Sequence, residues 1–259
     1  MIRAPDTPLV ARLHPAPGIE PRRGVSRPDM LVLHYTGMTS CARAIDWLAR
    51  PEAKVSCHYV IDLDGTITQM VAEAQRAWHA GVSAWAGETD INSRSIGFEI
   101  HNPGHDHGYP DFPEPQMAAV VALAADVVGR WRIPARRVLA HSDVAPHRKN
   151  DPGEKFDWQR LAAAGIGVWI EPTPVDAADA GHGPGATDDD VRRAQALLAD
   201  YGYCAPLHGG LDPETTRVLV AFQRHFRPAR VDGRLDRSTL LTLERLIAAA
   251  SASPRLATS

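Results

Sequence analysis

Apolar and polar positions alternate along parts of the first 170 residues in the way that β-strands require. Apolar runs at 30–33 and 138–140 have the length and composition of buried strands. Residues 95–100 alternate between apolar and polar side chains, which is typical of a strand with one buried face. Two more strand-like segments, 57–61 and 66–71, flank a short turn that contains Asp and Gly, and together they predict a β-hairpin.

Other segments repeat their apolar residues every three or four positions, which is the period of an α-helix. Residues 41–50 place their apolar side chains on one face, and residues 115–131 carry Ala and Val at the same spacing. The second segment should be the longest helix and should end before Pro134. Strands that alternate with helices predict an α/β domain. The hairpin predicts a mixed β-sheet flanked by helices rather than a purely parallel sheet.

The composition changes at about residue 171. Residues 171–187 (EPTPVDAADAGHGPGAT) are rich in Pro, Gly, Ala and Asp, and they contain no Leu, Ile, Met or aromatic residue. Such a composition is typical of a flexible linker. We therefore divide the chain into an N-terminal domain at 1–170, a linker at 171–186 and a small second domain at 187–259.

The second domain is predicted to consist of three short helices. They are expected at 188–200, at 213–226 and from residue 236 or 237 to residue 250. Thr187 and Asp212 are the expected N-caps of the first two helices. We predict that the aromatic residues of this domain form its small core rather than a platform for a sugar; they are Tyr201, Tyr203, Phe222 and Phe226.

The charge balance excludes some classes of partner. The chain carries 28 Lys and Arg against 31 Asp and Glu, and this formal net charge of −3 gives no electrostatic footprint for binding nucleic acid or an anionic membrane surface. No segment approaches the roughly 20 apolar residues of a transmembrane span. With 44% apolar residues the 259-residue chain can bury a core of its own, and we expect a monomer.

Three residues with metal-ligating side chains follow the predicted strands. His34 follows the run 30–33, His141 follows the run 138–140, and Asp151 lies ten positions later in a loop. Two imidazoles and one carboxylate leave a tetrahedral Zn²⁺ with one free position for a water molecule, whose pKa the metal lowers to about 7. A structural zinc site would more often be closed by thiolates. The pattern therefore favours a hydrolytic zinc centre.

Short motifs around these residues occur in an order that resembles a known family. The motifs are His34-Tyr35-Thr36, Ser56-Cys57-His58-Tyr59, Ala77-Trp78-His79-Ala80-Gly81, Ser95-Ile96-Gly97-Phe98-Glu99, His141-Ser142-Asp143 and Lys149-Asn150-Asp151-Pro152-Gly153. They are similar to those of the zinc-dependent N-acetylmuramoyl-L-alanine amidases of the AmiD/AmpD (amidase_2) type. In the second domain, Asp212-Pro213-Glu214-Thr215, Ala221-Phe222-Gln223 and Val231-Asp232-Gly233 resemble the three-helix peptidoglycan-binding module. The resemblance covers residues 27–165 and 187–248.

The resemblance implies an enzyme that binds peptidoglycan or muropeptides and cleaves the amide bond between the lactyl group of N-acetylmuramic acid and L-alanine. It implies a Zn²⁺ ion held by the three candidate ligands, with Glu99 as the general base and Lys149 facing the oxyanion. Some relatives place a tyrosine just before the histidine of the hairpin strand. Cys57 occupies that position here, so Glu99 is expected to act without help from a tyrosine.

Elementary chemistry agrees with these two roles. Amide hydrolysis needs a nucleophile, a base that takes its proton and a positive group near the carbonyl oxygen. Glu99 lies on the polar face of its strand, and chain connectivity holds Lys149 close to Asp151. The chain contains only three lysines, against 25 arginines. A lysine at position 149 is therefore less readily explained as a chance result of the composition. The simpler alternatives are an exposed strand carboxylate for Glu99 and a surface ion pair for Lys149.

Four further residues are assigned to substrate binding. Trp78, His79 and Trp85 lie in a segment without regular periodicity, which suits the wall of a groove, and Asn92 follows this segment. Ordinary aromatic packing of the tryptophans and a turn role for Asn92 are equally compatible with the sequence.

Other histidines offer rival metal sites. Residues 101–107 contain three histidines at short spacing, which could bind a metal in a loop, although the Pro and Gly among them favour a solvated loop. Cys57 and His58 are adjacent in a predicted strand, so their side chains point to opposite faces and cannot share one ion. His58 is expected to be buried and structural or to lie at the edge of the cleft.

Two other functions remain as alternatives. An amidase-like domain without activity could recognise peptidoglycan fragments only, but such a domain would typically lack part of the ligand set, which is complete here. A zinc peptidase acting within the stem peptide would need a motif such as H-E-x-x-H, which is absent. The sequence does not identify the third residue of the stem peptide. It also does not distinguish intact wall from soluble or anhydro muropeptides.

The predicted second domain indicates the location of the protein more clearly than the N-terminal residues do. Residues 1–6 lack the apolar run of a signal peptide, and three scattered cysteines form neither a disulfide framework nor a CxxC pair. A wall-binding module is most useful to an enzyme that acts on an insoluble polymer, because it raises the local concentration of the catalytic site. We therefore favour the cell envelope or periplasm, with the cytoplasm as the alternative.

Overall fold

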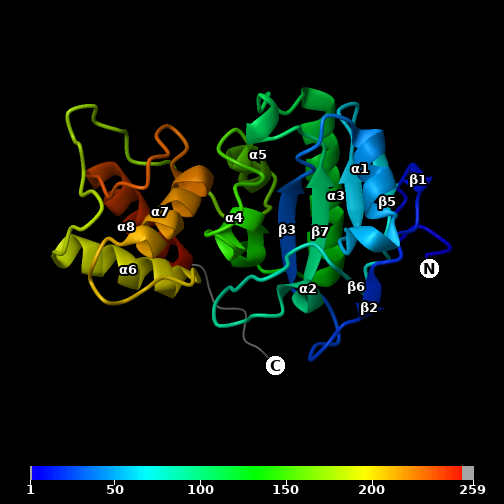
Figure 1. Ribbon diagram of the computed structural model, residues 1–259, viewed down its shortest axis with the longest axis horizontal. Helices are drawn as coiled ribbons and strands as arrows, with labels where there is room; N and C mark the ends of the chain where they lie inside the picture. Colours follow the sequence, from blue (N-terminus) through cyan, green and yellow to red (C-terminus); the bar gives the residue numbers. More distant parts are fainter. Residues whose placement is uncertain (1, 253–259) are drawn as a thin grey trace.

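The computed structural model describes residues 2–252, and it consists of a β-sheet domain with a helical module at one side (Figure 1). A six-stranded sheet has the order β1-β5-β4-β7-β3-β8. Its strands are β1 (Arg12–Leu13), β3 (Met30–Tyr35), β4 (Tyr59–Ile61), β5 (Ile67–Gln69), β7 (Ser95–Ile100) and β8 (Val138–Ala140). A separate antiparallel pair is formed by β2 (Ile19–Pro21) and β6 (Gln75–Ala77).

The sheet is mixed, as the sequence predicted. Strands β4 and β5 form the expected antiparallel hairpin. Strand β7 pairs in parallel with both β4 and β3, and β3 pairs in parallel with β8. The four neighbouring strands β4, β7, β3 and β8 therefore run in one direction, and their carboxyl ends lie along the same edge.

One face of the sheet is covered by α3 (Glu114–Trp131), the longest helix among the described residues, which starts and ends within a residue of the prediction. Leu31 and Leu33 of β3 point to this face, as do Phe98 and Ile100 of β7, and they pack against Val120 and its neighbours on α3. The short helix α5 (Trp158–Ala163) completes this core. The alternation along β3 thus sends Leu31 and Leu33 to the α3 side and His34 to the other side.

The opposite face of the sheet is covered by two different parts of the chain. Helix α1 (Cys41–Leu48) packs over Val60 of β4. Met30 and Val32 of β3 and Leu139 of β8 belong to a core cluster that continues through Trp85 and Val144 into the helical module. The cleft described below lies beside α1.

The remaining short elements lie mostly in the connections. They are η1 (Pro51–Ala53), α2 (Ile91–Arg94), η2 (His105–His107), η3 (Ala135–Arg137) and α4 (His141–Val144). None of the helices between residues 2 and 252 combines the length and the hydropathy that crossing a lipid bilayer requires.

The helical module contains three helices, as predicted: α6 (Asp189–Tyr201), α7 (Pro213–Phe226) and α8 (Arg237–Ala252). Asp212 caps α7, and its side chain accepts a hydrogen bond from Thr215 N–H. The N-cap of α6 is Asp188 and not Thr187, because the Asp188 carboxylate accepts from Val191 N–H. The four aromatic residues assigned to the core are buried there, which confirms that prediction; they are Tyr201, Tyr203, Phe222 and Phe226.

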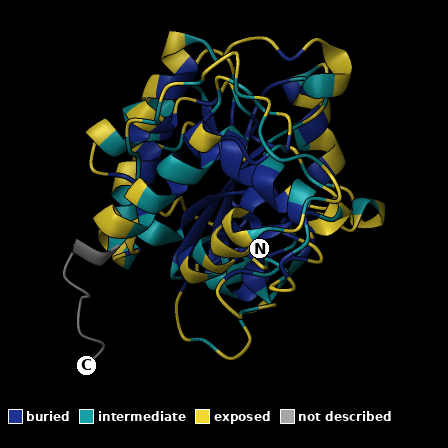
Figure 2. Cartoon of the chain, turned by 90° about the vertical axis from the view of Figure 1, so that its left-hand side faces the viewer, coloured by how far each residue is buried: buried dark blue, intermediate teal, exposed yellow. Residues whose placement is uncertain are grey.

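The module is docked on the sheet domain rather than loosely attached to it. Trp85, which is 2% exposed, packs edge-on against Tyr201 and Tyr203, with ring centroids 5.8 and 4.9 Å apart. Gly202 has a φ of +136°, and a Cβ at this position would lie 2.6 Å from the Trp85 ring. Ala86 N–H donates to Gly202 O at 2.7 Å. Seen from the module side, buried residues continue from the helices into the sheet (Figure 2).

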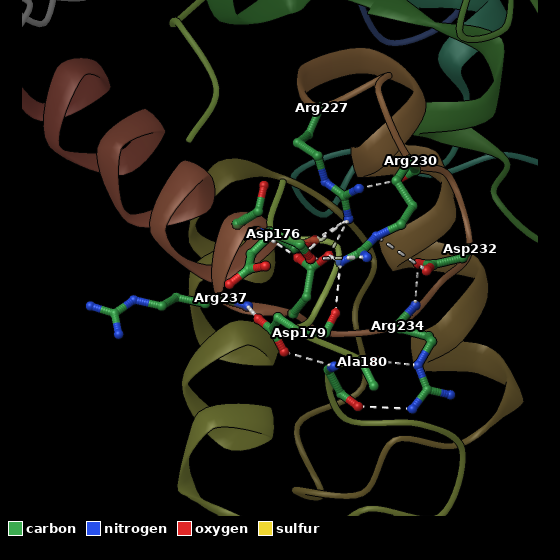
Figure 3. A network of polar contacts seen from close by, with 12 residues as sticks. Asp176, Asp179, Ala180, Arg227, Arg230, Asp232, Arg234 and Arg237 are labelled. Atoms are coloured by element: carbon green, nitrogen blue, oxygen red, sulfur yellow. Dashed lines mark hydrogen bonds and ion pairs between the residues drawn. The ribbon is translucent and has the colours of Figure 1, made fainter. Parts of the chain in front are cut away.

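The connection at 171–186 contains no helix or strand, but it is bound along the module, which corrects the expectation of a flexible linker. Arg230 donates to the carbonyl oxygens of Asp176 and Asp179, and Arg237 N–H donates to the Asp179 carboxylate (Figure 3). Arg234 donates to Ala180 O. His182 and Leu235 exchange backbone hydrogen bonds in an isolated bridge. These contacts hold the segment against the module, so it does not act as a free tether.

Candidate metal centre and active site

Three candidate ligands converge at the carboxyl edge of the parallel strands. His34 Nδ1 lies 2.8 Å from His141 Nδ1 and 3.1 Å from Asp151 Oδ2, and His141 Nδ1 lies 3.0 Å from the same carboxylate oxygen. All three residues are buried. Among residues 2–252 this is the group of His, Cys, Asp and Glu side chains that is arranged to hold a metal ion.

The sheet itself places two of these residues side by side. Leu33 and Ala140 are register partners on β3 and β8, and each is followed by one of the histidines. His34 continues β3, whereas His141 begins α4, where the chain turns. The loop that carries Asp151 is tied to α4, because Ser142 N–H donates to Asp151 O at 3.0 Å.

A chain of hydrogen bonds fixes the orientation of His34. Ser95 Oγ–H donates to Ile91 O at 2.6 Å, so this hydroxyl accepts a hydrogen bond from His79 Nε2–H at 3.1 Å. His79 Nδ1 therefore accepts from His34 Nε2–H at 3.0 Å. This leaves the lone pair of His34 Nδ1 directed toward the other two ligands. Outer partners of this kind set the tautomer of metal-ligating histidines.

His141 is oriented in the same way. Its Nε2 lies 3.2 Å from Ala80 O, to which it donates, so its Nδ1 lone pair also faces the centre. Asn92 holds the segment that supplies this acceptor, since its Oδ1 accepts from His79 N–H at 3.0 Å and Ala80 N–H at 2.8 Å. Gly97 leaves room for the His79 ring, because a Cβ at that position would lie 2.5 Å from His79 Cγ.

The electrostatics of the cluster suit a divalent metal. Burial, together with the neighbouring His141, lowers the pKa of His34 to about 4, so its imidazole is neutral near pH 7. Burial opposes ionisation of Asp151, but His141 and His34 outweigh it and hold the pKa of this carboxyl well below its usual range. Two imidazoles and one carboxylate form a donor set that Zn²⁺ favours in catalytic sites. The residues present therefore fit a zinc ion.

Glu99 lies beside this cluster. It is the register partner of His34 on the adjacent parallel strand β7, so both side chains project from the same face of the sheet. Its Oε2 is buried without a hydrogen-bond partner among the described residues. Burial raises the pKa of Glu99 well above its ordinary value, the Asp151 charge raises it further, and Lys149 opposes the shift. A carboxylate in this environment is a strong proton acceptor.

A cleft of about 310 Å³ contains the three ligands, Glu99 and Lys149. One wall comes from α1 and carries Trp47 and Leu48; Trp47 is 42% exposed. The opposite side carries Trp78, whose Nε1–H donates to Glu20 at 3.0 Å. Sequence reasoning did not assign Trp47 to the cleft. The signal that could have found it is its position beside the apolar face of a predicted helix.

A second hollow of about 330 Å³ adjoins the first and shares Val55, Trp78, His79 and Lys149 with it. Its lining is strongly basic, with one acidic residue; the charged residues are Glu20, Arg23, Lys54, Arg76, Arg148 and Lys149. Sequence reasoning missed these arginines because the overall charge is negative and nothing along the chain indicates that they gather. The hollow suits an anionic group that extends from the metal cleft.

The residues assigned to substrate binding divide into three groups. Trp78 lines both hollows and is available to a ligand. His79 also lines both hollows and Asn92 lines the second, but they are 8% and 6% exposed, and their polar atoms support the metal ligands. Trp85 is wrong as a groove residue, because it is buried between the sheet domain and the module.

The rival histidines do not assemble a second centre. His101 contacts Thr36 Oγ1, and His105 lies between Tyr35 and Glu154. His58 is fully buried, where its Nδ1 accepts from Gly97 N–H, and burial lowers its pKa to about 3. His58 is therefore structural, as one of the two expectations had it.

Comparison with known families and proteins agrees with this geometry. Residues 24–154 match the family described as N-acetylmuramoyl-L-alanine amidase, and residues 187–243 match a peptidoglycan binding domain. The chain is 38% identical over 237 residues to N-acetylmuramoyl-L-alanine amidase AmiD of Escherichia coli (strain K12), which covers 85% of this chain and 83% of that protein. It is 34% identical over 169 residues to 1,6-anhydro-N-acetylmuramyl-L-alanine amidase AmpD of the same strain, covering 58% and 90%.

Solved structures show the same arrangement of both parts. The E. coli AmiD complex with anhydro-N-acetylmuramic acid-L-Ala-D-gamma-Glu-L-Lys superimposes with a TM-score of 0.74 at 36% identity, covering 89% of this chain and 92% of that chain. AmpDh3 from Pseudomonas aeruginosa, in complex with anhydromuramic pentapeptide, superimposes with a TM-score of 0.72 at 31% identity, covering 89% and 96%. The similarity thus extends across the sheet domain and the helical module.

Proposed function

The chain belongs to the N-acetylmuramoyl-L-alanine amidase family, and we propose that it uses Zn²⁺ and Glu99 to hydrolyse the amide bond between the lactyl group of N-acetylmuramic acid and L-alanine. The observation that carries the proposal is the cluster of His34, His141 and Asp151 in one cleft with an unpartnered carboxylate beside it. A protein that only recognised peptidoglycan would not require this complete set.

The residues of the cleft have separate roles. A Zn²⁺ ion on the three ligands would supply a water molecule with a pKa of about 7 and polarise the scissile carbonyl. Glu99 would accept the proton of the attacking water and deliver it to the leaving amine, which is the usual work of a general base. Lys149, which lines the same cleft, would stabilise negative charge on the carbonyl oxygen. Cys57 does not take part in this scheme, because it is fully buried and burial keeps its thiol protonated by raising its pKa.

The two hollows suit the two ends of the substrate. The sugar would lie in the metal cleft against Trp47 and Trp78, because apolar ring faces stack on pyranose rings. The stem peptide would extend toward the basic hollow, where Lys54 and Arg148 would offer positive charge to its carboxylates. The complexes of AmiD and AmpDh3 with anhydromuramyl peptides support this class of ligand.

Product analysis tests the proposed reaction. Incubation with soluble anhydro-muropeptides should release a free stem peptide that begins with L-alanine, and mass spectrometry should detect it together with the peptide-free sugar. Treatment with a chelator should stop the release, and added Zn²⁺ should restore it. Cleavage within the peptide would instead show a peptidase, and binding without any product would show a recognition protein.

We also propose that the helical module binds polymeric cell wall, which places the protein in the cell envelope or periplasm. The match of residues 187–243 to a peptidoglycan binding domain supports this assignment. A wall-bound module raises the concentration of the catalytic site at an insoluble substrate. Full-length protein carrying His34→Ala should therefore sediment with purified sacculi. Failure to sediment would favour an enzyme that acts on soluble fragments in the cytoplasm.

A further inference from the structure

The module holds a buried carboxylate, Asp143, that lies close in the chain to a candidate metal ligand. Asp143 lies two residues after His141 on α4 and is 0% exposed. It accepts hydrogen bonds from Ala140 N–H at 2.8 Å, from Tyr203 OH at 2.7 Å and from His225 Nδ1 at 2.7 Å. Two of its three donors therefore come from the module, and the third is the residue directly before the metal ligand.

The donors from the module are held firmly in place. The His225 ring at the end of α7 is stacked between Trp158 and Phe226, with centroid distances of 3.7 and 3.9 Å. Tyr203 packs against Trp85 and Phe222. Because stacking and packing fix both side chains, the position of Asp143, and with it the position of α4, depends on the module.

A second connection reaches the other two ligands. Glu154, three residues after Asp151, accepts from Arg224 Nε of α7 at 3.4 Å and from His105 Nε2 at 3.1 Å. His105 Nδ1 in turn accepts from Tyr35 OH at 3.0 Å, and Tyr35 directly follows His34. Consecutive residues of α7, Arg224 and His225, thus connect to segments that carry all three candidate ligands.

We propose that the helical module is a positioning element of the metal site, acting through Asp143 on His141 and through Glu154 on the loop of Asp151. The inference rests on the zinc site proposed above. It assigns Tyr203 and His225 as positioning residues, although neither lies in the cleft or touches a ligand. The module would then have a role in catalysis apart from its role in binding the wall.

The physical reason lies in the environment of Asp143. A buried carboxylate that loses its hydrogen-bond donors is strongly disfavoured. Without the donors from Tyr203 and His225, only Ala140 N–H would remain, and α4 would shift to bring the carboxylate to other donors. Such a shift moves His141, which is the first residue of that helix. Because zinc tolerates little displacement of its ligands, its affinity would fall.

Zinc affinity of the full-length protein tests the proposal. The double variant Tyr203→Phe/His225→Phe removes both donors and keeps both aromatic rings, so the stacking is retained. We expect its Zn²⁺ dissociation constant, measured by competition with a chromogenic chelator, to rise about tenfold, the lower end of the range for outer partners of metal ligands. With Co²⁺ as the probe, the visible absorption spectrum of the variant should change, which a loss of stability alone would not cause.

Tyr201→Phe is the matched control, because Tyr201 lies at the same interface and its hydroxyl is not among the described donors to Asp143. Its Zn²⁺ affinity should stay within twofold of the parent. If the double variant does not fold, Tyr203→Phe alone provides the test, with a smaller rise expected. Unchanged affinity and an unchanged Co²⁺ spectrum in folded variants would overturn the inference. A parent protein that binds no Zn²⁺ would instead overturn the proposed function.

Discussion

His34 and Glu99 are register partners on adjacent parallel strands, and they project side by side from the same face of the sheet. One is a candidate metal ligand and the other the candidate base. The spacing of adjacent strands, about 4.8 Å, therefore sets the distance between the backbones of the two residues, and a mobile loop does not. A rigid sheet is a suitable support for a proton transfer that depends on distances of a few tenths of an ångström.

Glu99→Gln tests the base directly. The substitution keeps the size of the side chain and removes the proton acceptor, so kcat should fall by on the order of 10²-fold or more. Zinc content, measured by atomic absorption, should stay at about one ion per chain. Glu171→Gln, at an exposed position outside the cleft, is the control and should keep full activity. Activity of the Glu99 variant within a few-fold of the parent would assign the base to another residue.

The pH profile follows from the direction of the Glu99 shift. Burial and the Asp151 charge raise the pKa of Glu99 above the ordinary value of 4.5. Since the base acts only when deprotonated, kcat/KM should fall with decreasing pH through that raised pKa. The residual activity of Glu99→Gln should lack this acid limb. A profile that stays flat down to pH 4.5 in the parent would contradict the shift.

The same shift predicts how the stability of the metal-free protein depends on pH. A carboxyl group with a raised pKa in the folded state stabilises that state below its unfolded pKa, and the contribution is lost as the pH rises through the folded pKa. The metal-free protein should therefore lose stability between pH 4.5 and the raised pKa of Glu99, as measured by urea unfolding. Glu99→Gln should remove this component of the pH dependence.

Substitution of the ligands should remove the metal. His34→Ala or Asp151→Ala should abolish both stoichiometric Zn²⁺ and hydrolysis, because only two of the three donors would remain. His147→Ala replaces an exposed histidine of the same loop region and should leave both unchanged. Full activity of either ligand variant in a demonstrably metal-free sample would exclude the proposed mechanism.

Lys149→Ala should lower kcat by about 10²–10³, the usual cost of removing one group that stabilises an oxyanion. Lys155 supplies the control, since it pairs with Asp111 at the surface, 3.0 Å away. Steady-state kinetics on a soluble muropeptide separates the two variants. If Lys149→Ala changed KM alone, Lys149 would be a substrate-binding residue and not a catalytic one.

Trp85→Ala tests the interface between the sheet domain and the module. A cavity would replace a nearly fully buried indole, so the free energy of unfolding should fall by about 3–5 kcal/mol. Val82→Ala, three residues earlier and 80% exposed, should change it by less than about 0.5 kcal/mol. Denaturant unfolding of both variants checks this. A small effect at Trp85 would show that the docking of the module contributes little to stability.

The sequence by itself determined the fold class, the mixed sheet and the three helices of the module. These features follow from local periodicity, which the folded chain has to respect because each strand or helix buries one face. The apolar runs before His34 and His141 also placed both histidines at strand ends. The motif around them was specific enough to indicate an amidase.

Only the tertiary structure decided which residues hold the three candidate ligands in place and which parts of the chain contact the segments that carry them. The sequence assigned His79 and Asn92 to substrate binding, but their polar atoms hold His34 and Ala80. Trp85 is buried against the module. The segment 171–186 has the composition of a flexible linker, but arginines of the module donate hydrogen bonds to it and hold it in place. Contacts between residues some 50 to 80 positions apart depend on packing, and local composition carries no information about them.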